Sequence, residues 1–298
     1  MNDTTLFSLP VKETISSYIT LRQLDEIPVI IVSHPKVSAA VSLQGAQLLS
    51  WQPEGEKADL WLSKNSLFRK NTAIRGGIPI CWPWFGLVAQ PSHGFARLQE
   101  WQLTAHSELT DSVILTLTLS DNEMTKKIWP HEFTLIMRLK LAATCEIEFE
   151  YYGTEPTTGA LHTYLQVSDI NKIYIEGLGK HYIDKVADRD VYTEETKTYI
   201  TTRTDRIYTE SDDCNLVYDK NWQRILEIHH YHHSDIVCWN PGAELSSTIK
   251  DMTSDGYKKM LCLETAHISQ PMQPAGEKPA RMSLTLGVRS IKMQDVML

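Results

Sequence analysis

A histidine and a glutamate, placed in two largely apolar segments, are the residues of this chain whose types best suit proton transfer. His162 lies in the segment 161–167, where a β-strand would put it on one face with a tyrosine and a glutamine. Glu264 directly follows an apolar stretch, and carboxylates are rarely buried unless they are paired or functional. An imidazole and a carboxylate can act as general acid and base. The residues alone leave two simpler explanations open, a solvated sheet face for the first segment and an exposed edge strand for the second.

The densest unusual segment covers residues 74–86. Gly76 and Gly77 allow a positive φ or a close backbone approach, and two prolines exclude a helix beyond them. Two tryptophans and a phenylalanine supply flat surfaces of the kind that sugar rings stack against. Arg75 adds a fixed positive charge directly before the glycines. Considered alone, this segment is explained slightly better by an aromatic corner of the core than by a sugar pocket.

A second arginine follows within a short polar segment. Ser92, His93 and Arg97 bring a hydroxyl, an imidazole and a guanidinium close to Gly94, where the chain can turn. Such a group could bind an anion or a sugar hydroxyl. A surface arginine and a structural histidine are the commoner explanation of the same residues.

Residues 229–233 read His-His-Tyr-His-His, which is a composition typical of metal-binding tracts. On a strand, however, neighbouring histidines project to opposite faces, and no carboxylate or cysteine stands beside them at ligand spacing. Strong zinc signatures such as H-E-x-x-H do not occur in the chain. We therefore expect a solvent-facing or turn-side cluster here, and no metal site.

Alternation with a period of two dominates the elements that must position these residues. The segments 113–119, 133–141, 145–151 and 282–288 each present one apolar and one largely polar face, as half-buried antiparallel strands do. Helical patterns are rare, and residues 121–129 form the one short candidate, capped by Asp121 and ended before Pro130. No linker or internal repeat divides the chain. The sequence predicts an all-β fold, a single large antiparallel β-sandwich domain over residues 1–298 with few short helices.

Composition excludes several classes of function. The 298 residues carry a net charge of −8, which disfavours non-specific nucleic-acid binding. The first residues show no secretory pattern, and the apolar runs are far shorter than the roughly 20 residues of a membrane helix. The five cysteines are widely spaced and include no C-x-x-C pair. We expect a reduced, cytoplasmic protein without structural disulfides. No protein partner can be inferred.

Six short motifs, taken together and in order, resemble those of the hexose-6-phosphate mutarotases within the aldose 1-epimerase superfamily. They are I-R-G-G-I-P at 74–79, H-G-F-A-R at 93–97, L-H-T-Y at 161–164, T-D-R at 204–206, W-N-P at 239–241 and L-E-T-A at 263–266. Each motif is short, but six in the family's order are hard to obtain by chance. The resemblance covers most of the chain and implies a galactose mutarotase-like supersandwich with a sugar pocket.

The resemblance also assigns roles to individual residues. It makes His162 the general acid and Glu264 the general base, with Arg75 and Arg97 holding an anionic substrate and Asp205 contacting sugar hydroxyls. The implied substrate is a small sugar phosphate, a hexose 6-phosphate such as glucose 6-phosphate. The implied chemistry is interconversion of its α and β anomers, without metal or other cofactor.

Two further residues of the same region are candidates for substrate contact. Family members often carry glutamine directly before the His-Gly pair, whereas this chain has Ser92. Because the serine hydroxyl reaches less far than a glutamine amide, the resemblance supports a contact at His93 more than at Ser92.

Anomer exchange by ring opening requires a cationic His162 and an anionic Glu264 as starting states. We expect partial burial to raise the pKa of the glutamate, and a nearby carboxylate to keep the histidine charged. Two other functions remain open at this stage. A glycoside hydrolase would use two carboxylates, for which Asp205 and Glu264 could be proposed. A non-catalytic sugar-binding module would use Trp82, Trp84 and Phe85 as a stacking platform.

Overall fold

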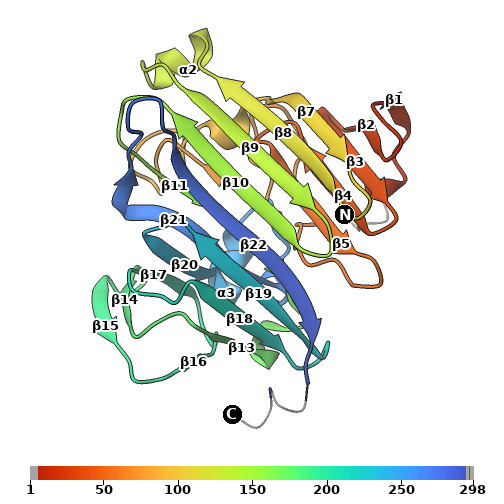
Figure 1. Cartoon of the computed structure of the whole chain (residues 1–298). Helices are drawn as coiled ribbons and strands as arrows, with labels where there is room; N and C mark the ends of the chain where they lie inside the picture. The colour runs from red at the N-terminus through yellow and green to blue at the C-terminus, as the bar shows by residue number, and fades with distance from the viewer. Residues whose placement is uncertain (1–5, 293–294, 296–298) are drawn as a thin grey trace.

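Antiparallel strands paired into three sheets form the framework of the protein (Figure 1). A computed structural model describes residues 6–292 and residue 295 of the chain. The first sheet has five strands in sequential order: β1 (Val11–Thr14), β2 (Ile19–Leu24), β3 (Ile27–His34), β4 (Val37–Ser42) and β5 (Gln47–Pro53).

The second sheet has nine strands and runs diagonally across the molecule, with β1–β5 near one end and β14–β16 near the other (Figure 1). Its order is β16 (Lys197–Thr198), β13 (Ile173–Glu176), β18 (Cys214–Asp219), β19 (Arg224–Tyr231), β22 (Ala280–Ser290), β10 (Cys145–Tyr152), β9 (Thr134–Leu141), β8 (Val113–Ser120) and β7 (Gln102–Glu108).

The third sheet has eight strands and carries the candidate catalytic residues. Its order is β15 (Arg189–Tyr192), β14 (His181–Asp184), β17 (Thr204–Tyr208), β20 (Asp235–Asn240), β21 (Met260–Met272), β11 (Thr157–Leu161) and β6 (Ile80–Cys81), and β12 (Tyr164–Gln166) also pairs with β21. Single bridges between Leu48 and Ile78 and between Leu60 and Leu165 join segments next to the first and third sheets.

Hydrophobic side chains from all three sheets form one continuous core. Ile30 of β3, Met137 of β9 and Leu261 of β21 are fully buried members of it. The alternation predicted from the sequence is confirmed: in β8, Val113, Leu115, Leu117 and Leu119 are buried while the intervening side chains are partly exposed. The all-β antiparallel fold is likewise confirmed. The interpretation of residues 1–298 as one domain stays a prediction, and its ends lie outside the described residues.

Short helices interrupt the strands: α2 (Glu123–Ile128), α3 (Gly242–Thr248), and the 3-10 turns η1 (Ala96–Leu98), η2 (Ile170–Lys172) and η3 (Gly256–Lys259). The predicted helix at 121–129 is present as α2, but its cap was predicted wrongly. Asn122 caps it, because its side-chain oxygen accepts hydrogen bonds from the amides of Met124 and Thr125. The Asp121 carboxylate instead accepts from the Phe133 amide. No helix in the described residues is long and apolar enough to cross a membrane.

Candidate active site

The pairing of β11 and β12 with β21 places His162 opposite Glu264. Leu161 of β11 pairs with Thr265, and Tyr164 of β12 pairs with Cys262, so the register is the same on both sides of the interruption at residues 162–163. The sequence predicted that His162 lies within a continuous strand. This is wrong, because His162 lies in the interruption between β11 and β12. Its backbone amide donates to the carbonyl of Pro79 instead (3.0 Å). The interruption frees the backbone of His162 from the ladder while keeping its side chain beside Glu264.

The two side chains are in contact and are almost fully buried. His162 Nε2 lies 3.2 Å from Glu264 Oε1, and the residues are 8% and 1% exposed. The imidazole stacks on the ring of Tyr164, with the ring centres 4.7 Å apart and the planes inclined by 8°. His162 Nδ1 and Glu264 Oε2 have no hydrogen-bond partner among the residues that the structure describes. Each member of the pair therefore has one buried polar atom whose hydrogen-bonding capacity is unused by the described residues.

Burial favours the neutral form of both groups. It lowers the pKa of His162 well below 6.5, and the nearby His93, Arg97 and Arg75 lower it further. It also raises the pKa of Glu264 well above 4.5, with the charge of Asp205 adding to the effect. The expectation for Glu264 is confirmed. Burial therefore disfavours the cationic His162 expected from the sequence, because loss of hydration outweighs the contact with a carboxyl group.

Four of the candidate residues line one cavity of about 580 Å³: His93, His162, Asp205 and Glu264. The sheet register explains the position of Asp205, which pairs with Trp239 of β20, which in turn pairs with Cys262 of β21. Directly paired residues project to the same face of a sheet, so Asp205 and Glu264 share that face. Burial raises the pKa of the Asp205 carboxyl.

Further residues also line the cavity, and among them the sequence analysis had given a sugar-stacking role to Phe85. They are Phe85, Gly86, Leu87, Val88, Lys185, Ile207, Val237, Trp239 and Ile268. Trp239 belongs to one of the six motifs, but nothing in the sequence singled out Lys185. Among the described residues, Lys185 is the one lysine or arginine that lines this cavity.

The segment that carries His93 is held by a tight backbone arrangement. His93 has a φ of 61°, and a Cβ at the following Gly94 would lie 2.0 Å from the carbonyl oxygen of Trp82, so only glycine fits there. The His93 ring accepts from the amide of Gly86 and lies 5.9 Å from the His162 ring, edge to face. Burial and two nearby arginines lower the pKa of His93 to about 4.

Arg97 lies near enough to His162 and Glu264 to affect the pKa of both, and it keeps an unused hydrogen-bond donor. One of its terminal nitrogens donates to the backbone carbonyl of Ser92 (2.7 Å), and its buried Nε has no partner among the described residues. Its charge lowers the pKa of His162 and opposes the rise in the pKa of Glu264. Ser92 thus contributes to the site through its backbone, which any residue could supply.

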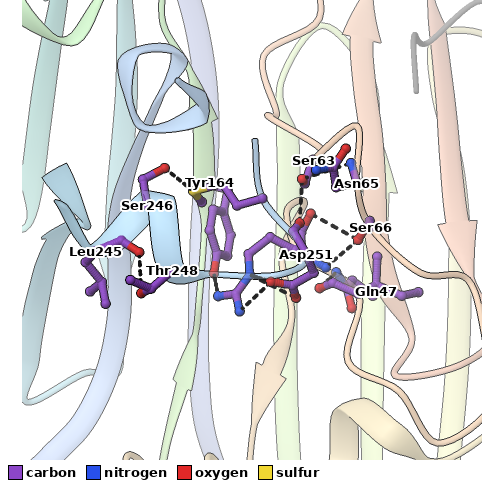
Figure 2. Close-up of polar contacts among 12 residues, drawn as sticks. Gln47, Ser63, Asn65, Ser66, Tyr164, Leu245, Ser246, Thr248 and Asp251 are labelled. Atoms are coloured by element: carbon purple, nitrogen blue, oxygen red, sulfur yellow. Dashed lines mark hydrogen bonds and ion pairs between the residues drawn. The ribbon is translucent and has the colours of Figure 1, made fainter. Parts of the chain in front are cut away.

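Arg75 is bound more completely than Arg97. Its Nε lies 3.2 Å from both carboxylate oxygens of Asp251, and a terminal nitrogen donates to the Tyr164 hydroxyl (3.2 Å). Tyr164 and Asp251, which both bond to Arg75, lie near each other in Figure 2. Neither Arg75 nor Arg97 is among the described residues that line the cavity.

One group of side chains has the composition of a cation site. His162, Cys262 and Glu264 each offer a ligand atom, and these atoms lie within 4.8 Å of one another. Burial raises the pKa of the Cys262 thiol well above 9.0, which disfavours the thiolate that a metal binds. The absence of a catalytic metal stays a prediction.

The histidines of residues 229–233 lie elsewhere, and the sequence interpretation was partly wrong about them. His230 is fully buried rather than solvent-facing, and its Nδ1 lies 2.8 Å from the hydroxyl of Thr265. Burial lowers its pKa to about 3. In the part of the chain that the structure describes, these histidines belong to no group with metal-ligand geometry.

Comparison with known proteins agrees with this geometry. A family model described as "Aldose 1-epimerase" matches residues 28–284, most of the chain. The protein belongs to the aldose 1-epimerase family. A relative in Escherichia coli K12, named "Putative glucose-6-phosphate 1-epimerase", is 48% identical over 95% of this chain and 98% of its own length. A relative of the same name in Haemophilus influenzae is 36% identical over 76% of this chain and 79% of its own length.

A solved structure of an aldose 1-epimerase relative gives the same architecture. The crystal structure described as "a putative mutarotase" from Salmonella typhimurium is 45% identical, with a TM-score of 0.95 over 96% of this chain and 99% of its own. The supersandwich implied by the sequence resemblance is thereby confirmed. The family is one of isomerases, so the protein is an enzyme of that class.

Proposed function

We propose that the protein interconverts the α and β anomers of a hexose 6-phosphate, with glucose 6-phosphate as its substrate. The observation that carries this proposal is the buried contact between His162 and Glu264, which open onto a cavity large enough for a hexose phosphate. The names of the E. coli and H. influenzae relatives support the same substrate.

The reaction opens and recloses the sugar ring. Glu264 takes the proton of the C1 hydroxyl while His162 protonates the ring oxygen, the C1–C2 bond rotates, and the two roles reverse on closure. This requires anionic Glu264 and cationic His162, whereas burial favours the neutral pair. The two states differ by one proton moved between atoms 3.2 Å apart. The neutral pair therefore already contains the proton that His162 must give to the ring oxygen. Polar groups of the substrate would stabilise the charged pair and so favour transfer of this proton from Glu264 to His162.

Phosphate recognition falls to the arginines behind the pair. Arg97 has unused donors, and Arg75 keeps the N–H groups that do not face Asp251 or Tyr164. A guanidinium can make two parallel hydrogen bonds to phosphate oxygens. Asp205 would accept hydrogen bonds from the sugar hydroxyls inside the cavity. His93 would contact the substrate from the same wall.

Neither alternative function is favoured. The three-ring stacking platform of a sugar-binding module is not formed, because Trp82 is fully buried against Phe95 and Phe133 in the core, and Phe85 is the one member of the three that lines the described cavity. A hydrolase would use Glu264 and Asp205 as its carboxylates, but Glu264 is in contact with an imidazole, as proton exchange requires. The relatives described above carry the name of an epimerase.

A cytoplasmic location is also part of the proposal. All five cysteines are free, and four of them are buried. Free thiols persist where the surroundings are reducing. Fractionation of cells that contain the tagged protein would test this location.

Replacing Arg97 by alanine should impair the phosphorylated substrate selectively. A hydrogen bond to a charged group contributes roughly 1.5–3 kcal/mol, so kcat/KM for glucose 6-phosphate should fall about 10- to 150-fold. The loss for unphosphorylated glucose should be much smaller. Lysine at position 97 should rescue only part of the activity, because an ammonium keeps the charge but not the planar fork. Equal losses on both sugars would mean that Arg97 does not read the phosphate.

Removing metal ions should leave the activity unchanged, because the proposed proton transfers need no cation. Anomer exchange would be measured before and after dialysis against a chelator, and again after zinc or magnesium is added. Activity that disappears on dialysis and returns with one of these ions would contradict this prediction and make His162, Cys262 and Glu264 the first candidates for its ligands.

A further inference from the structure

Arg75 is held by contacts with both a carboxylate and a phenol. An arginine that only bound phosphate would not need these two contacts. Asp251 faces the Nε side of its guanidinium, with a second nitrogen also 3.2 Å from the carboxylate. The Tyr164 hydroxyl accepts from the third nitrogen. The Arg75 and Asp251 side chains are only 28% and 24% exposed. The ion pair neutralises much of the charge that Arg75 could offer to a ligand, and it fixes the direction of the guanidinium.

Both ends of this ion pair are anchored to the backbone. Asp251 follows α3, and its carbonyl accepts from the buried hydroxyl of Ser63 (2.6 Å). The Arg75 amide donates to the Ser66 hydroxyl (2.7 Å), and its carbonyl accepts from the Ser63 amide (3.0 Å). Ser63 thus links the two partners directly, and their relative position is fixed.

Tyr164 connects the Arg75–Asp251 ion pair to His162. Its ring lies parallel to the His162 imidazole, with the ring centres 4.7 Å apart, and also stacks on Trp61 at 5.8 Å and meets Trp239 edge to face at 6.2 Å. The hydroxyl bonded to Arg75 is the polar atom of this side chain, so the hydrogen bond sets the position of the ring among these three neighbours.

We propose that Asp251 is a positioning residue, which acts through Arg75 and Tyr164 to hold the His162 ring in its reactive orientation. The inference rests on the proposed function to the extent that His162 is the acid of the reaction. It assigns to Asp251 a role that does not involve substrate contact. It also predicts that Asp251 serves the chemical step on every sugar, phosphorylated or not.

Asp251→Asn tests this role by removing the ion pair with little change in shape. We expect kcat to fall about 10- to 100-fold on both glucose 6-phosphate and glucose, since small misplacements of a catalytic group are costly. KM should change by less than about 3-fold, because no substrate contact is lost. Asp251→Glu, which keeps the charge, should restore part of kcat.

Tyr164→Phe provides an independent second test, because it keeps the stacked ring and removes the hydroxyl alone. It should reproduce the fall in kcat. The double variant Asp251→Asn/Tyr164→Phe should be little worse than either single one, since residues of one network are not additive. If Asp251→Asn does not fold, Tyr164→Phe decides the matter.

Glu227→Gln is the matched control. Glu227 pairs with Arg289 in the nine-stranded sheet at comparable exposure, 27% and 33%, so its loss should affect stability but not kcat. A folded Asp251→Asn or Tyr164→Phe protein with wild-type kcat would overturn the inference. So would a loss confined to the phosphorylated sugar, which would make Asp251 a support for phosphate binding. Wild-type protein without anomer exchange would instead contradict the proposed function.

Discussion

Replacing Glu264 by glutamine is expected to lower the rate of anomer exchange by about 10²–10⁴-fold, the contribution typical of a positioned proton transfer. Glutamine preserves the shape and hydrogen bonding of the side chain but cannot accept a proton. The residue is 1% exposed and touches His162, so no water can easily replace it as the base. The rate would be followed by polarimetry from a pure anomer. A variant with nearly the wild-type rate would mean that another residue is the base.

The melting temperature of the same variant provides a control with a defined sign. Because burial raises the pKa of Glu264, the native protein binds this proton more tightly than the unfolded chain does. That stability is fully present below the unfolded-state pKa of about 4.3 and is lost as the pH rises through the native-state pKa. Glutamine stays neutral at every pH. The melting temperature of Glu264→Gln should therefore increasingly exceed that of the wild type as the pH rises, and a constant difference would contradict this.

Replacing His162 by alanine should cause a loss of similar size, again about 10²–10⁴-fold. The imidazole is in contact with Glu264 and stacked on Tyr164, so alanine removes both the acid and the partner of the base. Since the two residues act as a unit, the double variant with Glu264→Gln should be little slower than either single variant. Fully additive losses would show that the two groups act in separate steps.

The pH profile of the wild type should match this shared proton. The pair is active when it holds one proton. It becomes inactive when it binds a second proton at low pH or loses its single proton at high pH, so the plot of kcat/KM against pH should be bell-shaped. Burial lowers the pKa of His162 and raises that of Glu264, which places the acid limb well below pH 6.5 and the alkaline limb well above pH 4.5. The profile is best measured on unphosphorylated glucose, whose own charge does not change in this range.

Local patterns in the sequence were sufficient to predict the strands but not their neighbours. The alternation at 113–119 shows which side of β8 is buried, because Val113 and the three leucines that follow at every second position face the core. Nothing local shows that β21 lies between β20 and β11, which brings Asp205 and Glu264 to one face. The six motifs supplied that relation through resemblance. The contact between His162 and Glu264 depends on a register that only the folded chain defines.

Residues whose role depends on long-range contacts were missed for the same reason. Asp251 lies far from Arg75 in sequence, and no pattern around it predicts an ion pair. His230 looked like a surface residue within a polar tract, but its strand turns it toward Thr265 in the interior. The charge state of His162 was also predicted wrongly, because the extent of its burial cannot be estimated from the residues around it in the chain.

The measurement that tests the central proposal most directly is the rate at which pure α-glucose 6-phosphate reaches anomeric equilibrium, compared with α-glucose and α-galactose. The rate for each sugar would be measured with wild-type protein, with Glu264→Gln and with buffer alone. We expect wild-type protein to accelerate all three exchanges above the rate in buffer, with the highest kcat/KM for glucose 6-phosphate. Glu264→Gln should remove most of the acceleration. Wild-type rates equal to those in buffer would contradict the proposal, and so would a preference for an unphosphorylated sugar.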